Sequence, residues 1–310
     1  MKWLALAGLL VLPLAVHSNF VLTIFVFSFI LGMMAVSFNL IFGFTGQLSM
    51  FHAAAFGLSA YITYLTVNWL HVSFWIGLLP ALVTVAIVSV LVGSICFKFK
   101  LKAFYFAIVT LAFSELARLV IMNWNSVTNG TLGLMVLDKP TVGLPGLGTL
   151  TIDGTVPWYF FSLAGLVLTV AVCTLALRSW IGRCFAAIRL DEDLAQTLGI
   201  DIFRYKLLSF VVANLLAALA GSLYAFYTGY IEPGYLGINQ SLDIIAMVLL
   251  GGRGSVTGPI VGAFVLTGLP HLIDLSGEAR AMLYGAILIL TILLMPRGLV
   301  GAVASLRRAA

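Results

Sequence analysis

The feature that most constrains this sequence is a series of apolar runs about twenty residues long. The stretch from 20 to 42, FVLTIFVFSFILGMMAVSFNLIF, contains no charged residue. A helix needs about 20 apolar residues to cross a bilayer, whereas membrane barrel strands show about ten residues of alternating polarity. Hydrophobic residues make up 62% of the 310 positions and charged residues 9%, and the mean hydropathy is +1.14. We therefore expect an all-α, polytopic helical membrane protein.

The apolar runs predict about ten transmembrane spans. Their approximate bounds are 3–17, 20–42, 49–70, 74–97, 101–124, 157–177, 206–230, 239–251, 258–274 and 280–296. If both termini lie in the cytosol, 13 of the 16 Lys and Arg residues fall on the cytosolic side, as the positive-inside rule requires. The net charge of +5 thus reflects membrane topology, and we expect lipid rather than nucleic acid around the chain.

The whole chain, 1–310, is expected to be one transmembrane domain with two long connections. The segment 178–205 is the longest cytosolic loop, and the segment 125–156, rich in Gly, Thr and Pro, is the main surface on the other side. Within the cytosolic loop, the stretch RLDEDLAQTLGID (189–201) holds four of the 11 acidic residues of the chain. Charge is therefore concentrated at one place on the cytosolic side.

This acidic stretch predicts a short amphipathic helix. Asp191 is suited to cap its first turn, Glu192 and Asp193 favour the positive end of the helix dipole, and Gly199 can end it. Leucines at 190, 194 and 198 recur every four residues on one side. Two interpretations stay open: a solvated helix on the membrane surface, or a docking element for a cytosolic partner.

Two Gly-rich stretches interrupt the spans and are candidates for a transport pathway. They are GFTGQLS (43–49) and GGRGSVTGP (251–259). Non-helical backbone at membrane depth is tolerated only inside protein or beside a wet cavity, although both stretches can also be ordinary tight turns. The first offers polar groups for the charged ends of an amino acid next to small apolar residues. Its candidate pathway residues are Thr45, Gly46, Gln47, Ser49 and His52.

The pair Glu115 and Arg118 lies inside a predicted span, where ionisable groups are costly. The two residues are three positions apart on one helix, so they can neutralise each other. The alternative is that both line the transport cavity near its outer mouth.

A stripe of small residues in the span 206–230 predicts a close approach by another helix. Its members are Ala213, Ala217, Gly221 and Ala225. Other motifs are missing from the sequence: it has no GxxxxGK[ST] phosphate loop, no HExxH, no GxSxG and no CxxC among its three cysteines. We expect no cofactor, no metal site and no enzymatic activity of its own.

Five ordered blocks resemble the M-type membrane subunit of branched-chain amino acid ABC importers. They are GFTGQLSMFHAAAFGLSAY (43–61), AFYFAIVTLAFSELARLV (103–120), IGRCFAAIRLDEDLAQTLGIDIFRYKLLSFVVA (181–213), MVLLGGRGSVTGPIVGA (247–263) and LMPRGL (294–299). Within them, DLAQTLG (193–199) is similar to the EAAxxxG loop of ABC importer permeases, with Asp in place of Glu and Leu in place of the first Ala. In that family the loop forms a coupling helix that sits in a cleft of the ATPase subunit.

The resemblance implies a multi-pass permease of the bacterial inner membrane. Its implied partners are a homologous H-type permease, two ATPase subunits that bind the ATP, and a periplasmic binding protein that delivers leucine, isoleucine or valine. The implied coupling residues are Asp191, Glu192, Asp193, Leu194, Ala195, Leu198 and Gly199.

One alternative function stays open, a stand-alone secondary carrier or channel for a small polar solute such as urea or an amide. Such a protein would have no need of the cytosolic helix, and it would transport without any ATPase.

Overall fold

A computed structural model describes residues 8–13, 18–101, 103–144, 148–273, 285 and 298–302 of the chain. Within them, five helices are long and apolar enough to cross a membrane. They are Asn19–Phe44 (α2, Asn19–Asn39, continued by the π-helix η1, Leu40–Phe44), Phe74–Lys98 (α4), Phe104–Asn123 (in α5, Ala103–Asn123), Thr155–Arg178 (α7) and Ile202–Thr228 (α10). The predicted class, a polytopic helical membrane protein, is confirmed.

Three further helices occupy predicted spans but are shorter. They are α3 (His52–Leu70), α11 (Ile238–Gly251) and α12 (Thr257–Ile273). At 1.5 Å per residue, the 14 residues of α11 extend only about 21 Å, less than the roughly 30 Å of a hydrocarbon core. The predicted spans 3–17 and 280–296 lie largely outside the described residues, although residues 8–13 are helical.

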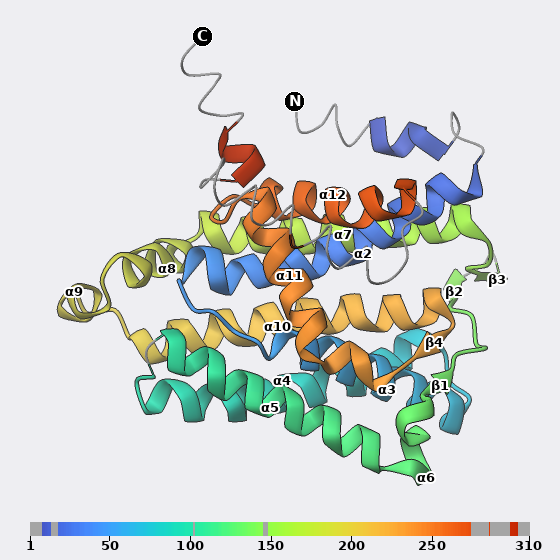
Figure 1. Cartoon of the computed structure of the whole chain (residues 1–310), viewed down its shortest axis with the longest axis horizontal. Helices are drawn as coiled ribbons and strands as arrows, with labels where there is room; N and C mark the ends of the chain where they lie inside the picture. Colours follow the sequence, from blue (N-terminus) through green and yellow to red (C-terminus); the bar gives the residue numbers. More distant parts are fainter. Residues whose placement is uncertain are drawn as a thin grey trace.

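The long helices form two groups that lie side by side (Figure 1). One group holds α2, α7 and α12, and the other holds α3, α4, α5 and α10, with α11 running obliquely between them. Helices α2 and α10 pack against each other and are the most buried of the five spans. Aromatic rings pack between the helices of the first group. The ring centroid of Phe29 of α2 lies 5.1 Å from that of Tyr159 of α7 and 5.5 Å from that of Phe264 of α12.

The small-residue stripe of α10 packs against α3 of the same chain. Ala213, Ala217 and Ala225 are buried, and a methyl group added at Gly221 would overlap the backbone oxygen of Phe56. At this close approach Ser59 Oγ donates a hydrogen bond to the Ala218 carbonyl over 2.6 Å. The helix that approaches the stripe is therefore an internal one.

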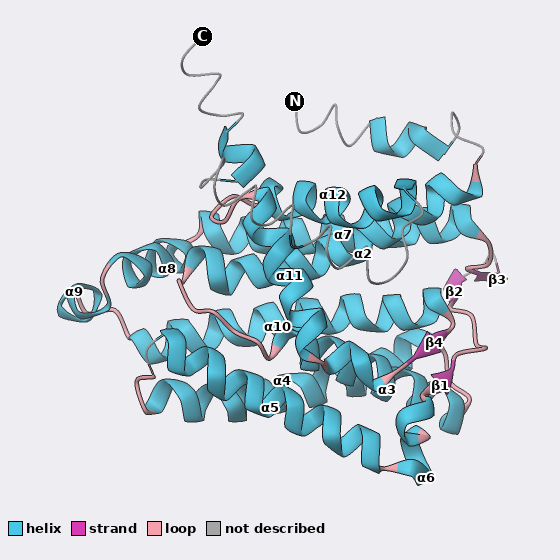
Figure 2. Ribbon diagram, viewed as in Figure 1, coloured by secondary structure: helices cyan, strands magenta, loops and turns pink. Residues whose placement is uncertain are grey.

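The connection 125–156 contains short strands that the all-α expectation did not include (Figure 2). Its elements are α6 (Asn125–Thr128), the 3-10 turn η2 (Gly130–Leu132), β1 (Leu134–Met135), β2 (Thr141–Leu144) and β3 (Gly148–Thr151). Strand β1 pairs with β4 (Tyr230–Ile231), which precedes the 3-10 turn η3 (Pro233–Leu236), and β2 pairs with β3. Lys139 Nζ bonds Asp153 Oδ2 over 2.6 Å beside this hairpin and lowers the pKa of the Asp153 carboxyl.

The connection 178–205 contains two helices where the sequence predicted one. They are α8 (Trp180–Leu190) and α9 (Glu192–Thr197), and α10 already begins at Ile202. Helix α8 has the usual signals, because the Ser179 hydroxyl caps the Ile181 amide over 3.2 Å and its buried Cys184, Phe185 and Ile188 follow a helical period. The two helices stand at one end of the molecule, which we call the α9 end, and the strands lie at the opposite end (Figure 1).

Candidate functional site

Helix α9 is held in shape by its caps. Asp191 Oδ1 accepts hydrogen bonds from the amides of Asp193, over 2.9 Å, and Leu194, over 3.0 Å. At its other end Gly199 has φ +82, a left-handed conformation that glycine adopts without strain. The Ile200 amide then bonds back to the Ala195 carbonyl over 3.1 Å. The segment is thus a defined, capped turn of helix.

The outer side of α9 is apolar and exposed. Leu194 and Leu198 are 59% and 72% exposed, whereas Ala195 is buried against the rest of the chain. The predicted helix face through 190, 194 and 198 is interrupted, because Leu190, 87% exposed, ends α8 and the backbone is extended at Asp191. Figure 1 shows α9 projecting beyond the ends of the long helices. A cluster of exposed leucines on a projecting helix is typical of a surface that another molecule covers.

The inner side of α9 is polar and paired. One oxygen of Glu192, Oε1, lies 2.6 Å from Lys206 Nζ of α10 and 3.3 Å from Gln47 Nε2. Lys206 is only 5% exposed, and its ammonium group lies 5.9 Å from the centre of the Phe97 ring. A groove of about 290 Å³ runs beside this pair, lined in part by Phe97, Lys100 and Phe203. The structure therefore brings the predicted coupling residue Glu192 together with the predicted pathway residue Gln47.

The first break is a buried non-helical segment, residues 45–50, between η1 and α3. Figure 1 shows it running inward from the α9 end before α3 begins. The Met50 amide donates to Thr110 Oγ1 of α5 over 3.0 Å, and Ser241 Oγ of α11 donates to the Met50 carbonyl over 3.1 Å. This break is therefore packed inside the protein, the setting in which irregular backbone is tolerated at membrane depth.

Apart from the half-buried Gly46, the predicted pathway residues of this break are buried, and some of their polar atoms are satisfied locally. Thr45 Oγ1 donates to the Ile41 carbonyl over 2.6 Å, and Ser49 Oγ accepts from the Phe51 amide over 3.2 Å. His52 Nε2 lies 3.2 Å from Ser37 Oγ. Among the described residues, neither His52 Nδ1 nor Gln47 Oε1 has a hydrogen-bond partner. These two buried atoms are the unpaired polar groups of the predicted pathway residues.

The second break is a tight turn fastened to the end of α2. Gly252 and Gly254 have φ +109 and +84, and Ser255 Oγ accepts from the Gly258 amide over 2.9 Å at the start of α12. Asn39, the last residue of α2, donates from Nδ2 to the Ser255 carbonyl over 2.9 Å and accepts from the Gly254 amide over 3.2 Å. The second break is therefore held at the helix end that leads, through η1, into the first.

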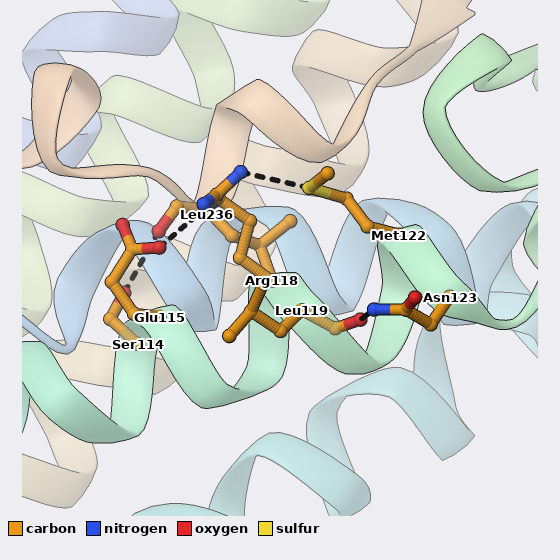
Figure 3. A network of polar contacts seen from close by, with 7 residues as sticks. All are labelled: Ser114, Glu115, Arg118, Leu119, Met122, Asn123 and Leu236. Atoms are coloured by element: carbon orange, nitrogen blue, oxygen red, sulfur yellow. Dashed lines mark hydrogen bonds and ion pairs between the residues drawn. The ribbon is translucent and has the colours of Figure 1, made fainter.

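Glu115 and Arg118 form an ion pair on α5, away from both breaks. Arg118 Nε lies 2.6 Å from Glu115 Oε2, and the side chains are 29% and 31% exposed, respectively. Figure 3 shows the guanidinium reaching back to Glu115 while Nη1 contacts Met122 Sδ over 2.9 Å. Among the described residues, no hydrogen bond or ion pair joins this pair to the first break. Glu115 instead lines a hollow of about 440 Å³ on the outer face of α5.

A family model described as "Branched-chain amino acid transport system / permease component" matches residues 20–293. The chain belongs to this family. The family consists of transport permease components, which confirms the predicted resemblance and the expectation of a transport subunit rather than an enzyme.

The curated relatives of this permease chain carry M-type and H-type names. It is 28% identical over 284 residues to the "High-affinity branched-chain amino acid transport system permease protein LivM" of Escherichia coli strain K12, covering 86% of this chain and 66% of the relative. It is 24% identical over 298 residues to the corresponding LivH of Salmonella typhimurium strain LT2, covering 87% and 90%. A probable LivM of Methanocaldococcus jannaschii is 26% identical over 246 residues, covering 72% and 68%.

The permease chain spans 66% of the length of the first of these LivM relatives. No solved structure matches it. Among the described residues there is no cluster of His, Cys, Asp and Glu that could hold a metal ion.

Three residues of the permease chain that the sequence did not single out are central to this site. Lys206 and Arg189 entered the sequence analysis only as basic residues on the predicted cytosolic side, and Asn39 was one polar residue near the end of an apolar run. The available signal was the position of Lys206 at the start of the predicted span 206–230, since a Lys at the edge of an apolar helix is rarely buried without a partner.

Proposed function

We propose that the chain is the M-type permease subunit of an ABC importer of the bacterial inner membrane, moving branched-chain amino acids into the cytosol. Separate ATPase subunits bind the ATP, a homologous H-type permease completes the membrane part, and a periplasmic binding protein delivers the solute. The observation that carries this proposal is α9, a capped helix with exposed leucines at 194 and 198 outside and the Glu192 pairing inside. A subunit driven from outside needs such a docking element.

The family and its relatives support the transport role and the class of solute. The names of the LivM and LivH relatives describe high-affinity branched-chain amino acid transport systems. Matches to both types support a membrane part built from two related permeases.

The outer face of α5 supports contact with that second permease. A charged pair that faced lipid near the middle of a span would be expensive, yet Glu115 and Arg118 are about 30% exposed in the single chain. Around them, Ala112, Leu116, Leu119 and Val120 line the hollow beside α5. A neighbouring protein that covers this face would remove both the charges and the apolar surface from lipid.

The α9 end is assigned to the cytosol and the opposite end to the periplasm. This orientation places the leucines of α9 against an ATPase subunit and the connection 125–156 where a binding protein can dock. It agrees with the concentration of Lys and Arg on the cytosolic side of the predicted topology.

The test is a substrate panel on the complex purified from membranes that contain the tagged chain. We expect ATPase and H-type permease subunits to co-purify, and labelled leucine uptake into proteoliposomes to fall when unlabelled isoleucine or valine is added. Urea and acetamide should not compete. Uptake of urea by the chain alone, with no co-purifying ATPase, would establish the stand-alone channel instead.

A further inference from the structure

The charges on the inner side of α9 reach the transport break by an unbroken series of contacts. Glu192 Oε1 binds both Lys206 Nζ, over 2.6 Å, and Gln47 Nε2, over 3.3 Å. Gln47 lies in the non-helical segment 45–50, and Glu192 is the first residue of α9. One carboxylate oxygen therefore joins the projecting helix to the irregular backbone inside the bundle.

A second contact joins α8, the helix before α9, to η1, the helix that leads into the break. Arg189, near the end of α8, donates from Nη1 to the carbonyl of Gly43 in η1. The site has little room, since a methyl group added at Gly46 would lie 3.4 Å from Arg189 Cγ, and one at Gly254 would lie 3.2 Å from Arg189 Nη1. Arg189 thus lies close to both breaks.

The Glu192 contact satisfies the buried charge of Lys206. Lys206 is 5% exposed, whereas the Glu192 side chain is 46% exposed, and a lysine left buried without its partner is strongly unfavourable. The ammonium group therefore holds Glu192 to the end of α10. Movement of α9 must then carry the end of α10 with it or separate this ion pair, and it carries Gln47 as long as the 3.3 Å hydrogen bond between Gln47 Nε2 and Glu192 Oε1 holds.

We infer that a set of four side chains, which we call the clasp, transmits the displacement of α9 to the segment 45–50 and so couples ATP hydrolysis to opening of the pathway. The clasp consists of Glu192, Lys206, Gln47 and Arg189. This inference rests on the proposed function. The segment 45–50 is the part that can respond, because it is not helical. A few hydrogen bonds hold it: the amides of Thr45 and Gln47 bond back to the Ile41 carbonyl over 3.3 and 3.1 Å, and Met50 bonds Thr110 and Ser241. Lys206 and Arg189 thereby gain a positioning role that their place in the sequence did not indicate.

The experiment measures leucine uptake and ATP hydrolysis together in proteoliposomes that contain the complete complex. In Gln47→Met the amide donor is lost while the Glu192–Lys206 ion pair stays intact. In Glu192→Gln the charge is lost. We expect uptake per ATP hydrolysed to fall by about tenfold in each, within the usual range of coupling between distant sites, with unchanged co-purification of the ATPase.

The matched control is Arg204→Gln. It breaks an exposed ion pair with Asp201, 2.9 Å long, two residues from Lys206 on the same helix. It should keep the wild-type ratio of uptake to hydrolysis.

The double variant Gln47→Met with Glu192→Gln separates the clasp from a simple pathway role of Gln47. If the two residues act through one contact, the double variant should be no worse than either single variant. Multiplied losses, or an unchanged ratio in Gln47→Met, would overturn the inference. If Glu192→Gln fails to assemble, the ratio of uptake to hydrolysis in Gln47→Met, compared with that in Arg204→Gln, tests the inference alone. The proposed function itself fails separately, by absence of ATP-driven uptake in the wild-type complex.

Discussion

At the scale of single residues, the stability of the molecule depends on how a few charged side chains among apolar neighbours are paired. Lys206 is nearly fully buried and is paired with Glu192, whose side chain is 46% exposed, whereas Glu115 and Arg118 are each about 30% exposed and paired with each other. The expected cost of removing a partner depends on the burial of the charge that is left behind, because solvent screens an exposed charge more than a buried one.

The ion pair on α5 gives the first prediction, a double-mutant cycle. Glu115→Gln or Arg118→Met alone leaves one charge without its partner, and we expect a loss of about 1–2 kcal/mol in stability, less than for a fully buried pair because each side chain is about 30% exposed. The double variant should recover most of this loss. The measurements are the yield of assembled complex and the rate of leucine uptake.

The two measurements separate neutralisation from solute binding. If the pair only neutralises itself, uptake should recover together with yield in the double variant. A double variant that assembles normally yet transports slowly would show that the pair contacts the solute.

At the scale of helices, packing depends on whether a position has room for one more methyl group. In α10, Gly221 lies so close to α3 that a methyl would overlap the backbone of Phe56. In α2, Gly32 leaves ordinary room, since a methyl there would lie 3.5 Å from Leu166 Cδ1 and 3.9 Å from Ala263 Cβ. Both positions are buried in the middle of a helix, so they form a matched pair.

We expect Gly221→Ala to destabilise the chain by about 1–3 kcal/mol through overpacking. Gly32→Ala should be neutral or stabilising by up to about 1 kcal/mol, because alanine favours helix. The measurement is the fraction of each variant that stays monodisperse in detergent after heating. Equal behaviour of the two variants would mean that α3 and α10 are not in this close contact.

The exposed leucines of α9 give a third prediction. Leu194→Ser with Leu198→Ser removes apolar surface from the outside of α9 while keeping Asp191, Gly199 and Glu192, and we expect the ATPase subunit to be lost on purification. Leu137→Ser, an exposed leucine at the opposite end, is the control and should retain it. Normal ATPase recovery with the α9 variant would assign the helix to the membrane surface.

Helices of this kind are predictable from sequence where their signal is local. The span 20–42 corresponds to α2 and η1, 74–97 to α4 and 157–177 to α7, because about twenty apolar neighbours suffice to predict a span. The caps of α9 were equally local, since Asp191 and Gly199 act on residues within one turn.

Other features depend on residues far apart in the chain. Gln47 and Glu192 are 145 positions apart, and Asn39 and Ser255 are 216 apart. Neither contact therefore produces a periodic pattern in the sequence from which it could be predicted. The strand β1 forms only because β4 lies beside it. Helix α8 could have been predicted from Ser179 and its apolar period, but it lies in the connection 178–205, for which only the helix in the acidic stretch was predicted.

At the scale of the whole molecule, the two ends are built for different tasks. The α9 end gathers both breaks, the clasp and the exposed leucines, while the opposite end carries the short strands of the connection 125–156 (Figure 1). Energy supplied at the α9 end therefore acts close to the backbone that interrupts the long helices. The chain itself has no phosphate loop, so in the proposed function this energy comes from another subunit.

The central claim is that transport through this chain is driven by a separate ATPase that acts at α9. The most direct measurement is labelled leucine uptake into proteoliposomes with ATP on the α9 side, compared among three preparations: the complete complex, the complex with a hydrolysis-deficient ATPase subunit, and the two permease subunits alone. We predict uptake against a gradient only in the first. Concentrative uptake of equal rate in the permease subunits alone would contradict the account.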